Sequence, residues 1–314
     1  MCWKHVDEEA CTFTIHDCLS LLVSSRWYGW EGKGGKERYY TSRPLYKRLD
    51  RVLQHYLRTS EFLYSMMRLK KGVLERRNES HLFGLLVEAR RYMSLFQHHD
   101  GVTGTSKQHV MVDYGQKMFM AIKNCEQIIL AATDFLLRNV SAKDVPPKPS
   151  IFMEEIRSAY DSSPEKRVVT SASTLIVFNS LGKKVAKTIC VHVKSLNVVV
   201  HAASGPSDIV PQQISPVVQF IDGQWNISAT LFELKPFQLC FHAVIPPVSF
   251  RKYLIRSGSP KLKATIRVNF SGVQNSNFVI EPLREFAFGN GLITAAFDPV
   301  TGHLKVCEQL WLLI

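Results

Sequence analysis

The sequence lacks most of the short motifs by which an active site is recognised. It contains no Gly-x-Ser-x-Gly, no His-Glu-x-x-His and no phosphate loop with its lysine. These absences argue against the common serine hydrolases, zinc proteases and P-loop proteins. It also lacks long hydrophobic runs, because a segment such as residues 310–314 is far shorter than the roughly 20 residues that a transmembrane helix needs. The sequence therefore predicts no membrane span.

The seven cysteines form no Cys-x-x-Cys pair, and their odd number leaves at least one unpaired within the chain. A Cys/His cluster near the N-terminus has spacings that match neither half of a zinc finger. We therefore interpret residues 1–38 as a divergent or poorly ordered leader. The alternative, a leader that binds zinc through Cys11 and Cys18, stays open. The cluster consists of Cys2, His5, Cys11, His16 and Cys18.

Charge and glycosylation sequons bear on partners and compartment. The formal net charge is +12, but the Lys and Arg residues are scattered from end to end, so we expect no nucleic-acid partner. Four Asn-x-Ser/Thr sequons favour a secretory-pathway lumen, whereas residues 1–25 have neither the basic nor the apolar region of a signal peptide. The chain is thus either not luminal or a fragment. The sequons begin at Asn78, Asn139, Asn226 and Asn269.

Apolar residues recur at intervals of three and four in three segments between residues 39 and 140, which is the period of an amphipathic helix. The first segment begins with Ser42 as its expected cap. The third begins at an expected capping box formed by Thr105 and Gln108. Because only short turns join the three segments, residues 39–140 are predicted to form an antiparallel three-helix bundle.

Residues 141–166 contain four prolines among Ser, Asp and Lys, which predicts an interdomain linker. Beyond it the hydrophobic period shifts towards two, and residues 167–314 are predicted to form an antiparallel β-sandwich region that the end of the chain truncates. The predicted fold is α+β and multidomain, without the βαβ alternation of a nucleotide-binding sheet. Strands are expected at residues 175–179, 187–193, 197–202, 217–221, 226–233, 238–245, 264–270, 278–280 and 292–297.

One turn, between the second and third predicted helices, carries the adjacent residues His98, His99 and Asp100. Regular structure cannot point three neighbours the same way, but a turn can bring two of them to one centre. A catalytic zinc ion takes three or four N/O ligands, of which this turn can supply one or two. From composition alone, a plain polar loop is the favoured interpretation. An exposed i,i+4 pair is likewise favoured for His109 and Asp113 over a carboxylate that orients a metal ligand.

The chain closely resembles the class II α-mannosidases, glycoside hydrolase family 38, in motifs on both sides of the second helix. These are Tyr39-Tyr-Thr-Ser-Arg-Pro-Leu-Tyr-Lys-Arg-Leu-Asp-Arg51, then Phe96-Gln-His-His-Asp-Gly-Val-Thr-Gly-Thr105 and Val112-Asp-Tyr-Gly115. The similarity is nearest to the Golgi branch of the family. It continues more loosely to the C-terminal part of the chain and covers roughly residues 39–306.

The resemblance implies a zinc-dependent retaining hydrolase that removes α-linked mannose from N-glycans in the Golgi lumen. In such enzymes one carboxylate attacks the anomeric carbon and a second protonates the leaving oxygen. The resemblance makes His99 a Zn²⁺ ligand and Asp100 a contact of a sugar hydroxyl, and it places His98 in the same pocket. The resemblance therefore favours a zinc and sugar site at this turn over the plain polar loop that composition alone favours. It also implies a membrane-anchored parent protein and leaves room for a homodimer.

The family's remaining zinc ligands, its nucleophile and its acid/base residue belong to an N-terminal α/β barrel that precedes the Tyr-Thr-Ser-Arg-Pro motif. Nothing in this sequence resembles that barrel. We therefore assign no catalytic residue to the chain and predict that it is an inactive fragment containing the helical middle domain and part of the β region. The alternative is a non-catalytic carbohydrate-binding or interaction protein that reuses the same domains.

Overall fold

A computed structural model of the chain describes residues 41–70, 76–137, 151–202, 209–217, 219–221, 224–226, 236–259, 265–268, 279–282, 286–289, 293–298 and 303–309. The predicted leader and the first part of the predicted linker lie outside these residues. The boundaries proposed for the leader, bundle, linker and β region stay predictions. No helix within these ranges is long and apolar enough to cross a membrane.

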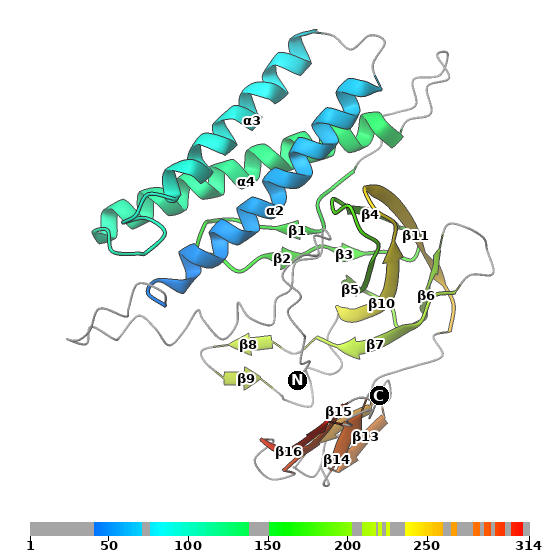
Figure 1. Cartoon of the computed structure of the whole chain (residues 1–314). Coiled ribbons are helices and arrows are strands. Elements are labelled where there is room, and N and C mark those ends of the chain that lie inside the picture. The colour runs from blue at the N-terminus through cyan, green and yellow to red at the C-terminus, as the bar shows by residue number, and fades with distance from the viewer. Residues whose placement is uncertain are drawn as a thin grey trace, which may run out of the picture.

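Three helices form an antiparallel bundle, as predicted (Figure 1). They are α2 (Pro44–Leu69), α3 (Arg76–Phe96) and α4 (Gln108–Leu137). The apolar stripes that the sequence showed meet in one core, in which Leu53 and Leu63 of α2 and Met118 of α4 have no exposed surface. Burial of these faces, more than local propensity, holds helices of this length in place.

Both predicted helix caps are wrong. The N-cap residue of α2 is Arg43, and no side chain caps the helix, because the Ser42 hydroxyl donates instead to the Thr103 carbonyl at 2.7 Å. Helix α4 begins at Gln108, so Thr105 lies ahead of the cap position, and its hydroxyl donates to Asp100. In each case another acceptor, distant in sequence for Ser42 and in the same turn for Thr105, outcompetes the helix backbone for a hydroxyl group.

Two facing sheets form a sandwich around a second apolar core. In β10 every second side chain, from Phe237 to Ile245, is buried, which is the alternation of a strand with one face on a core. One sheet has the order β3 (Val168–Val169), β5 (Val185–Val193), β10 (Phe237–Ile245) and β7 (Gln212–Pro216); the other has the order β4 (Thr174–Asn179), β11 (Ser249–Ser257) and β6 (Val198–Ala202).

The α+β fold class is confirmed, but the β region is not purely antiparallel. Strand β3 pairs with β5 in parallel. Two later strands, β12 and β13, also pair with each other in parallel. The remaining strands are β1 (Glu155–Ile156), β2 (Glu165–Lys166), β8 (Gln219–Ile221), β9 (Gln224–Asn226), β12 (Thr265–Val268), β13 (Val279–Pro282), β14 (Phe286–Gly289), β15 (Ile293–Phe297) and β16 (Leu304–Gln309). The strand expected at residues 226–233 lies outside the described residues, apart from its first position.

A disulfide bond joins Cys190 of β5 to Cys240 of β10, which face each other in the strand register. Sequence spacing gave no sign of this pair, because the strand register that brings the two cysteines together is a tertiary feature. Cys125, in α4, is a free and buried thiol. Burial raises its pKa to about 12, so the thiol stays protonated and unreactive at neutral pH.

The second half of the predicted linker packs on the bundle. Its β1–β2 pair is antiparallel, and between these strands the ring of Tyr160 stacks on Tyr46 of α2, with 5.8 Å between the ring centroids. The same ring closes over Gly115 of α4, where an added Cβ would lie 2.5 Å from Tyr160 Cδ2. Residues 151–166 are therefore an ordered contact between the bundle and the β region.

This contact predicts opposite effects for two helical glycines. Gly115→Ala should lower the free energy of unfolding by about 1–2 kcal/mol, because the clash with Tyr160 exceeds the gain of roughly 1 kcal/mol that alanine gives a helix. Gly84→Ala in α3, where an added Cβ meets nothing within 4 Å, should raise it by up to about 1 kcal/mol. Urea unfolding followed by circular dichroism measures both, and a shift of the same sign in the two variants would contradict the packing described.

Candidate metal centre

The candidate site lies on the turn between α3 and α4, and the turn is built by its own backbone. The carbonyl of His98 accepts hydrogen bonds from the amides of Gly101 at 2.8 Å and Val102 at 3.1 Å, and the carbonyl of Asp100 accepts one from Ser106 at 3.0 Å. Further along, Gly104 donates to the Gly101 carbonyl at 2.9 Å. The backbone that carries the imidazoles and the carboxylate is therefore fixed from both sides.

Glycine is required at two positions of the turn. Gly104 has a φ of 75°, and an added Cβ would lie 2.7 Å from the Ser42 hydroxyl oxygen. A Cβ added at Gly101 would lie 2.7 Å from the Phe96 carbonyl oxygen. A side chain at either position would push the turn away from α2 or from the end of α3.

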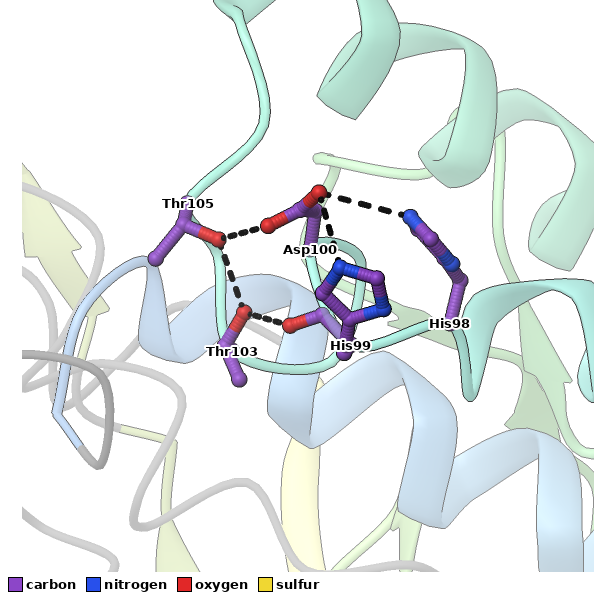
Figure 2. Close-up of polar contacts among 5 residues, drawn as sticks. All are labelled: His98, His99, Asp100, Thr103 and Thr105. Carbon is purple, nitrogen blue, oxygen red and sulfur yellow. Dashed lines mark hydrogen bonds and ion pairs between the residues drawn. The ribbon is translucent and has the colours of Figure 1, made fainter.

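Three side chains of the turn converge on one side of it (Figure 2). The Nε2 atoms of His98 and His99 each lie 3.4 Å from the same oxygen, Oδ2 of Asp100, and the two imidazole centroids are 4.2 Å apart. The side chain of His99 is 82% exposed, and those of His98 and Asp100 are 45% and 47% exposed. All three sequence-predicted site residues are thus together, on an open surface.

The other carboxylate oxygen of Asp100 is already engaged. Its Oδ1 accepts a hydrogen bond from the Thr105 hydroxyl at 2.8 Å, while the hydroxyl of Thr103 donates to the His99 carbonyl and lies 3.0 Å from the Thr105 hydroxyl (Figure 2). The Thr105 hydrogen bond, helped by the charges of His99 and His98 against some desolvation, holds the pKa of Asp100 below its ordinary value. The carboxylate is therefore ionised at neutral pH, with Oδ2 facing the imidazoles.

The donor set suits a zinc ion in chemistry, because imidazole nitrogens and a carboxylate oxygen are among its usual ligands. Ligand atoms about 2.0–2.1 Å from a tetrahedral ion lie about 3.3–3.4 Å from one another; each Nε2–Oδ2 distance, 3.4 Å, agrees with this spacing, whereas the set as a whole spreads over up to 4.8 Å. The three ligand atoms all lie within 4.8 Å of one another, and no other group of three or more His, Cys, Asp or Glu residues in the described ranges does so. Cys11 and Cys18, the alternative zinc ligands, are outside those ranges.

A buried carboxylate ties the beginning of the turn to α2. Gln97, the residue before His98, donates from its side-chain amide to Oδ1 of Asp50 at 2.8 Å. Burial raises the pKa of Asp50, against smaller opposing effects of Arg51 and of this hydrogen bond. The carboxylate of Asp113 pairs with Lys117 one turn further along α4, so the i,i+4 pair favoured for His109 and Asp113 is not the contact that the described residues show.

Thr105, Thr103, Gln97 and Asp50 are parts of the site's support that the sequence did not reveal. All four stand inside the first two motifs, but their hydrogen-bond partners follow from the turn geometry or from contacts across the bundle. A carboxylate with a hydroxyl residue five positions later, in a glycine-rich turn, is the local signal that could have identified Thr105.

Known proteins are similar to this chain in the region that carries the site. Residues 37–136 match the α-mannosidase middle domain, a range that contains both the start of α2 and the His-His-Asp turn. This chain belongs to the α-mannosidase family. It is 33% identical over 281 residues to alpha-mannosidase 2 of Homo sapiens and 31% identical over 292 residues to alpha-mannosidase 2x of Mus musculus. With alpha-mannosidase 2 of Arabidopsis thaliana it shares 34% identity over 229 residues.

These alignments cover 85%, 87% and 70% of this chain, but only 24%, 24% and 19% of the three relatives. The chain thus spans about a quarter of the length of the α-mannosidases it matches. Among solved structures, a glycosyl hydrolase family 38 protein from Enterococcus faecalis covers 83% of this chain and is itself covered over 30% of its length, with 14% identity and a TM-score of 0.41. The family resemblance drawn from the motifs is confirmed by the sequence relatives.

The hydrogen bond from Thr105 gives a prediction for Asp100. Thr105→Val keeps the shape of the side chain and removes the donor, so the pKa of Asp100 should rise towards its ordinary value. Thr105→Ser retains a hydroxyl and should keep the pKa low. Titration of the Asp100 carboxyl carbon by NMR measures both variants, and equal titration curves for the valine and serine forms would rule out this role for the hydroxyl.

Proposed function

We propose that this chain supplies one side of the active site of a zinc-dependent, retaining α-mannosidase that acts on N-glycans. His99 would be a zinc ligand, Asp100 would bind a hydroxyl of the mannose that is cleaved, and His98 would line the same pocket. The observation that carries the proposal is the convergence of these three side chains within the segment that matches the α-mannosidase middle domain.

Each side chain has a role that its geometry supports. The Nε2 atom of His99 is open to solvent, so a metal ion held partly by other residues can reach it. The Oδ2 atom of the ionised Asp100 accepts a hydrogen bond from a sugar hydroxyl, while Oδ1 stays with Thr105. His98 offers an imidazole edge beside that oxygen. A bound zinc ion would supply a Lewis acid that fixes the hydroxyl groups of the sugar.

Hydrolysis needs more than this turn. A retaining glycosidase uses two carboxyl groups about 5 Å apart, one as nucleophile and one as acid/base. Asp100 is the single carboxylate of the described metal-binding cluster, and it is assigned to the substrate. The relatives are about four times as long as the matched region, so we assign the catalytic pair and the remaining zinc ligands to residues beyond those described here.

An oxidising, luminal compartment is part of the proposal. The Cys190–Cys240 bond persists only where the glutathione system does not reduce it, and the four sequons favour the same pathway. With the resemblance to the Golgi branch of the family, this supports a Golgi lumen location and N-glycans carrying α-linked mannose as partners. The second candidate, a non-catalytic mannose-binding protein, is favoured by the presence of sugar-facing groups without a catalytic pair in the described cluster.

Both candidates predict that the purified 314-residue chain does not hydrolyse an aryl α-mannoside, with or without added zinc, since the cluster holds no nucleophile and acid pair. Measurable hydrolysis that survives Asp100→Asn and His99→Ala would place the reaction elsewhere and refute the assignment. In a protein extended to the length of the relatives, binding of mannosides without hydrolysis would favour the non-catalytic candidate.

In that longer protein the site residues can be separated by their effects. His99→Ala should remove the bound zinc and with it the activity, whereas Asp100→Asn should keep the zinc and lower kcat/KM by about 100-fold or more, because a hydrogen bond to a charged group in the transition state is lost. His81→Ala, an exposed histidine on α3, is the matched control and should change neither. Zinc content by atomic absorption and initial rates measure the outcome; unchanged zinc in His99→Ala would contradict its role.

A further inference from the structure

The motif Thr41-Ser-Arg-Pro-Leu-Tyr-Lys-Arg48 at the start of α2 has no role in the proposed chemistry, yet it touches the turn at three points. The Ser42 hydroxyl donates to the Thr103 carbonyl at 2.7 Å, and the Lys47 Nζ donates to the Val102 carbonyl at 2.7 Å. The Arg43 guanidinium donates to the Ser106 carbonyl. We call Ser42, Arg43 and Lys47 the α2 brace.

The brace acts on the part of the turn that follows Asp100. The carbonyls it binds belong to residues 102, 103 and 106, which flank Thr105, the donor to Asp100. All three contacts join residues 55 to 63 positions apart in the chain. Two of the donors are cations, and hydrogen bonds from charged donors are roughly twice as strong as neutral ones. The brace therefore fixes the backbone on which the Asp100–Thr105 contact depends.

Backbone strain marks the same place. Arg43 has φ 50° and ψ 56°, a left-handed conformation that a non-glycine residue rarely adopts, and a residue that precedes proline normally has an extended backbone. The hydrogen bonds from Ser42 and Arg43 to the turn hold Arg43 in this left-handed conformation. On the other side of this contact, Gly104 leaves room for the Ser42 hydroxyl.

We propose that Ser42, Arg43 and Lys47 are positioning residues of the metal and sugar site: through the carbonyls of residues 102–106 they hold the turn so that the Asp100 carboxylate and the two imidazoles converge. The effect on metal and sugar binding rests on the proposed function, whereas the hydrogen bonds between the brace and the turn do not depend on it. The brace also accounts for why two motifs separated by the whole of α3 belong to one site.

Lys47→Met tests the brace, and the same helix offers a matched control. Lys70, at the other end of α2, donates to the Leu136 carbonyl at 2.9 Å, so Lys70→Met removes an equivalent bond far from the turn. In the full 314-residue chain, Lys47→Met should raise the exchange rate of the Ser106 and Gly104 amides about tenfold relative to the unmodified chain. Lys70→Met should leave these rates unchanged, and Lys47→Arg should restore them in part.

The second readout is metal binding, with Co²⁺ as the probe. Titration of the histidine imidazole signals by NMR should show a dissociation constant about tenfold weaker in Lys47→Met, in line with the effects of residues that support metal ligands, and no change in Lys70→Met. Equal exchange rates and equal Co²⁺ affinities in Lys47→Met and Lys70→Met would overturn the proposal.

The two readouts separate this inference from the proposed function. If the unmodified chain shows no Co²⁺-dependent change at His98 and His99 but Lys47→Met still accelerates amide exchange in the turn, the brace stands and the metal assignment loses support. If Co²⁺ binds at the cluster and neither readout responds to Lys47→Met, the metal assignment stands and the brace is refuted.

Discussion

The site depends on one contact, the docking of the start of α2 against the turn between α3 and α4. The turn alone has a few backbone hydrogen bonds of its own, which fix a local shape but not its place on the protein. Beneath it, Phe96 at the end of α3 packs edge-on against Tyr114 of α4, with ring centroids 5.6 Å apart. The bundle core therefore sets where the turn emerges, and α2 then holds it from outside.

This arrangement combines a fixed backbone with exposed side chains. The carbonyls of the turn are bound by donors from α2, whereas His99 points almost wholly into solvent. A metal site that is closed by its own residues would bury its ligands, whereas the exposed set found here suits the proposed site, in which other residues supply the remaining ligands. In such a site the fixed backbone would lower the entropy that is lost when those ligands and the sugar bind.

Much of the fold follows from local periodicity, and strand β11 shows where periodicity fails. The helices and strands β5 and β10 were predicted because their apolar residues repeat with the period of the element. Strand β11, the centre of the second sheet, was missed because Arg251, Lys252 and Arg256 interrupt its apolar character, although Tyr253 and Ile255 fill the core. Periodicity cannot anticipate a strand whose outward face is charged and whose two neighbours come from distant sequence.

The residues of the site were likewise within reach of the sequence, whereas the support of the site was not. The residue types alone favoured a plain polar loop, and it was the resemblance of the motif to the α-mannosidases that selected His98, His99 and Asp100, whose side chains lie together in the structure. No spacing rule predicts that the hydroxyl groups of Ser42 and Thr105 bind the Thr103 carbonyl and the Asp100 carboxylate instead of capping a helix.

That choice decides the chemistry of Asp100, because its two oxygens cannot exchange roles freely. Rotation of the carboxylate away from the imidazoles would break the hydrogen bond from Thr105, and movement of Thr105 is opposed by the contacts that hold its neighbours Thr103 and Ser106. The carboxylate thus presents one oxygen outwards with little freedom to turn. A hydrogen-bond donor that approaches the turn therefore meets an acceptor that is already oriented, which is the geometry that the proposed sugar contact requires.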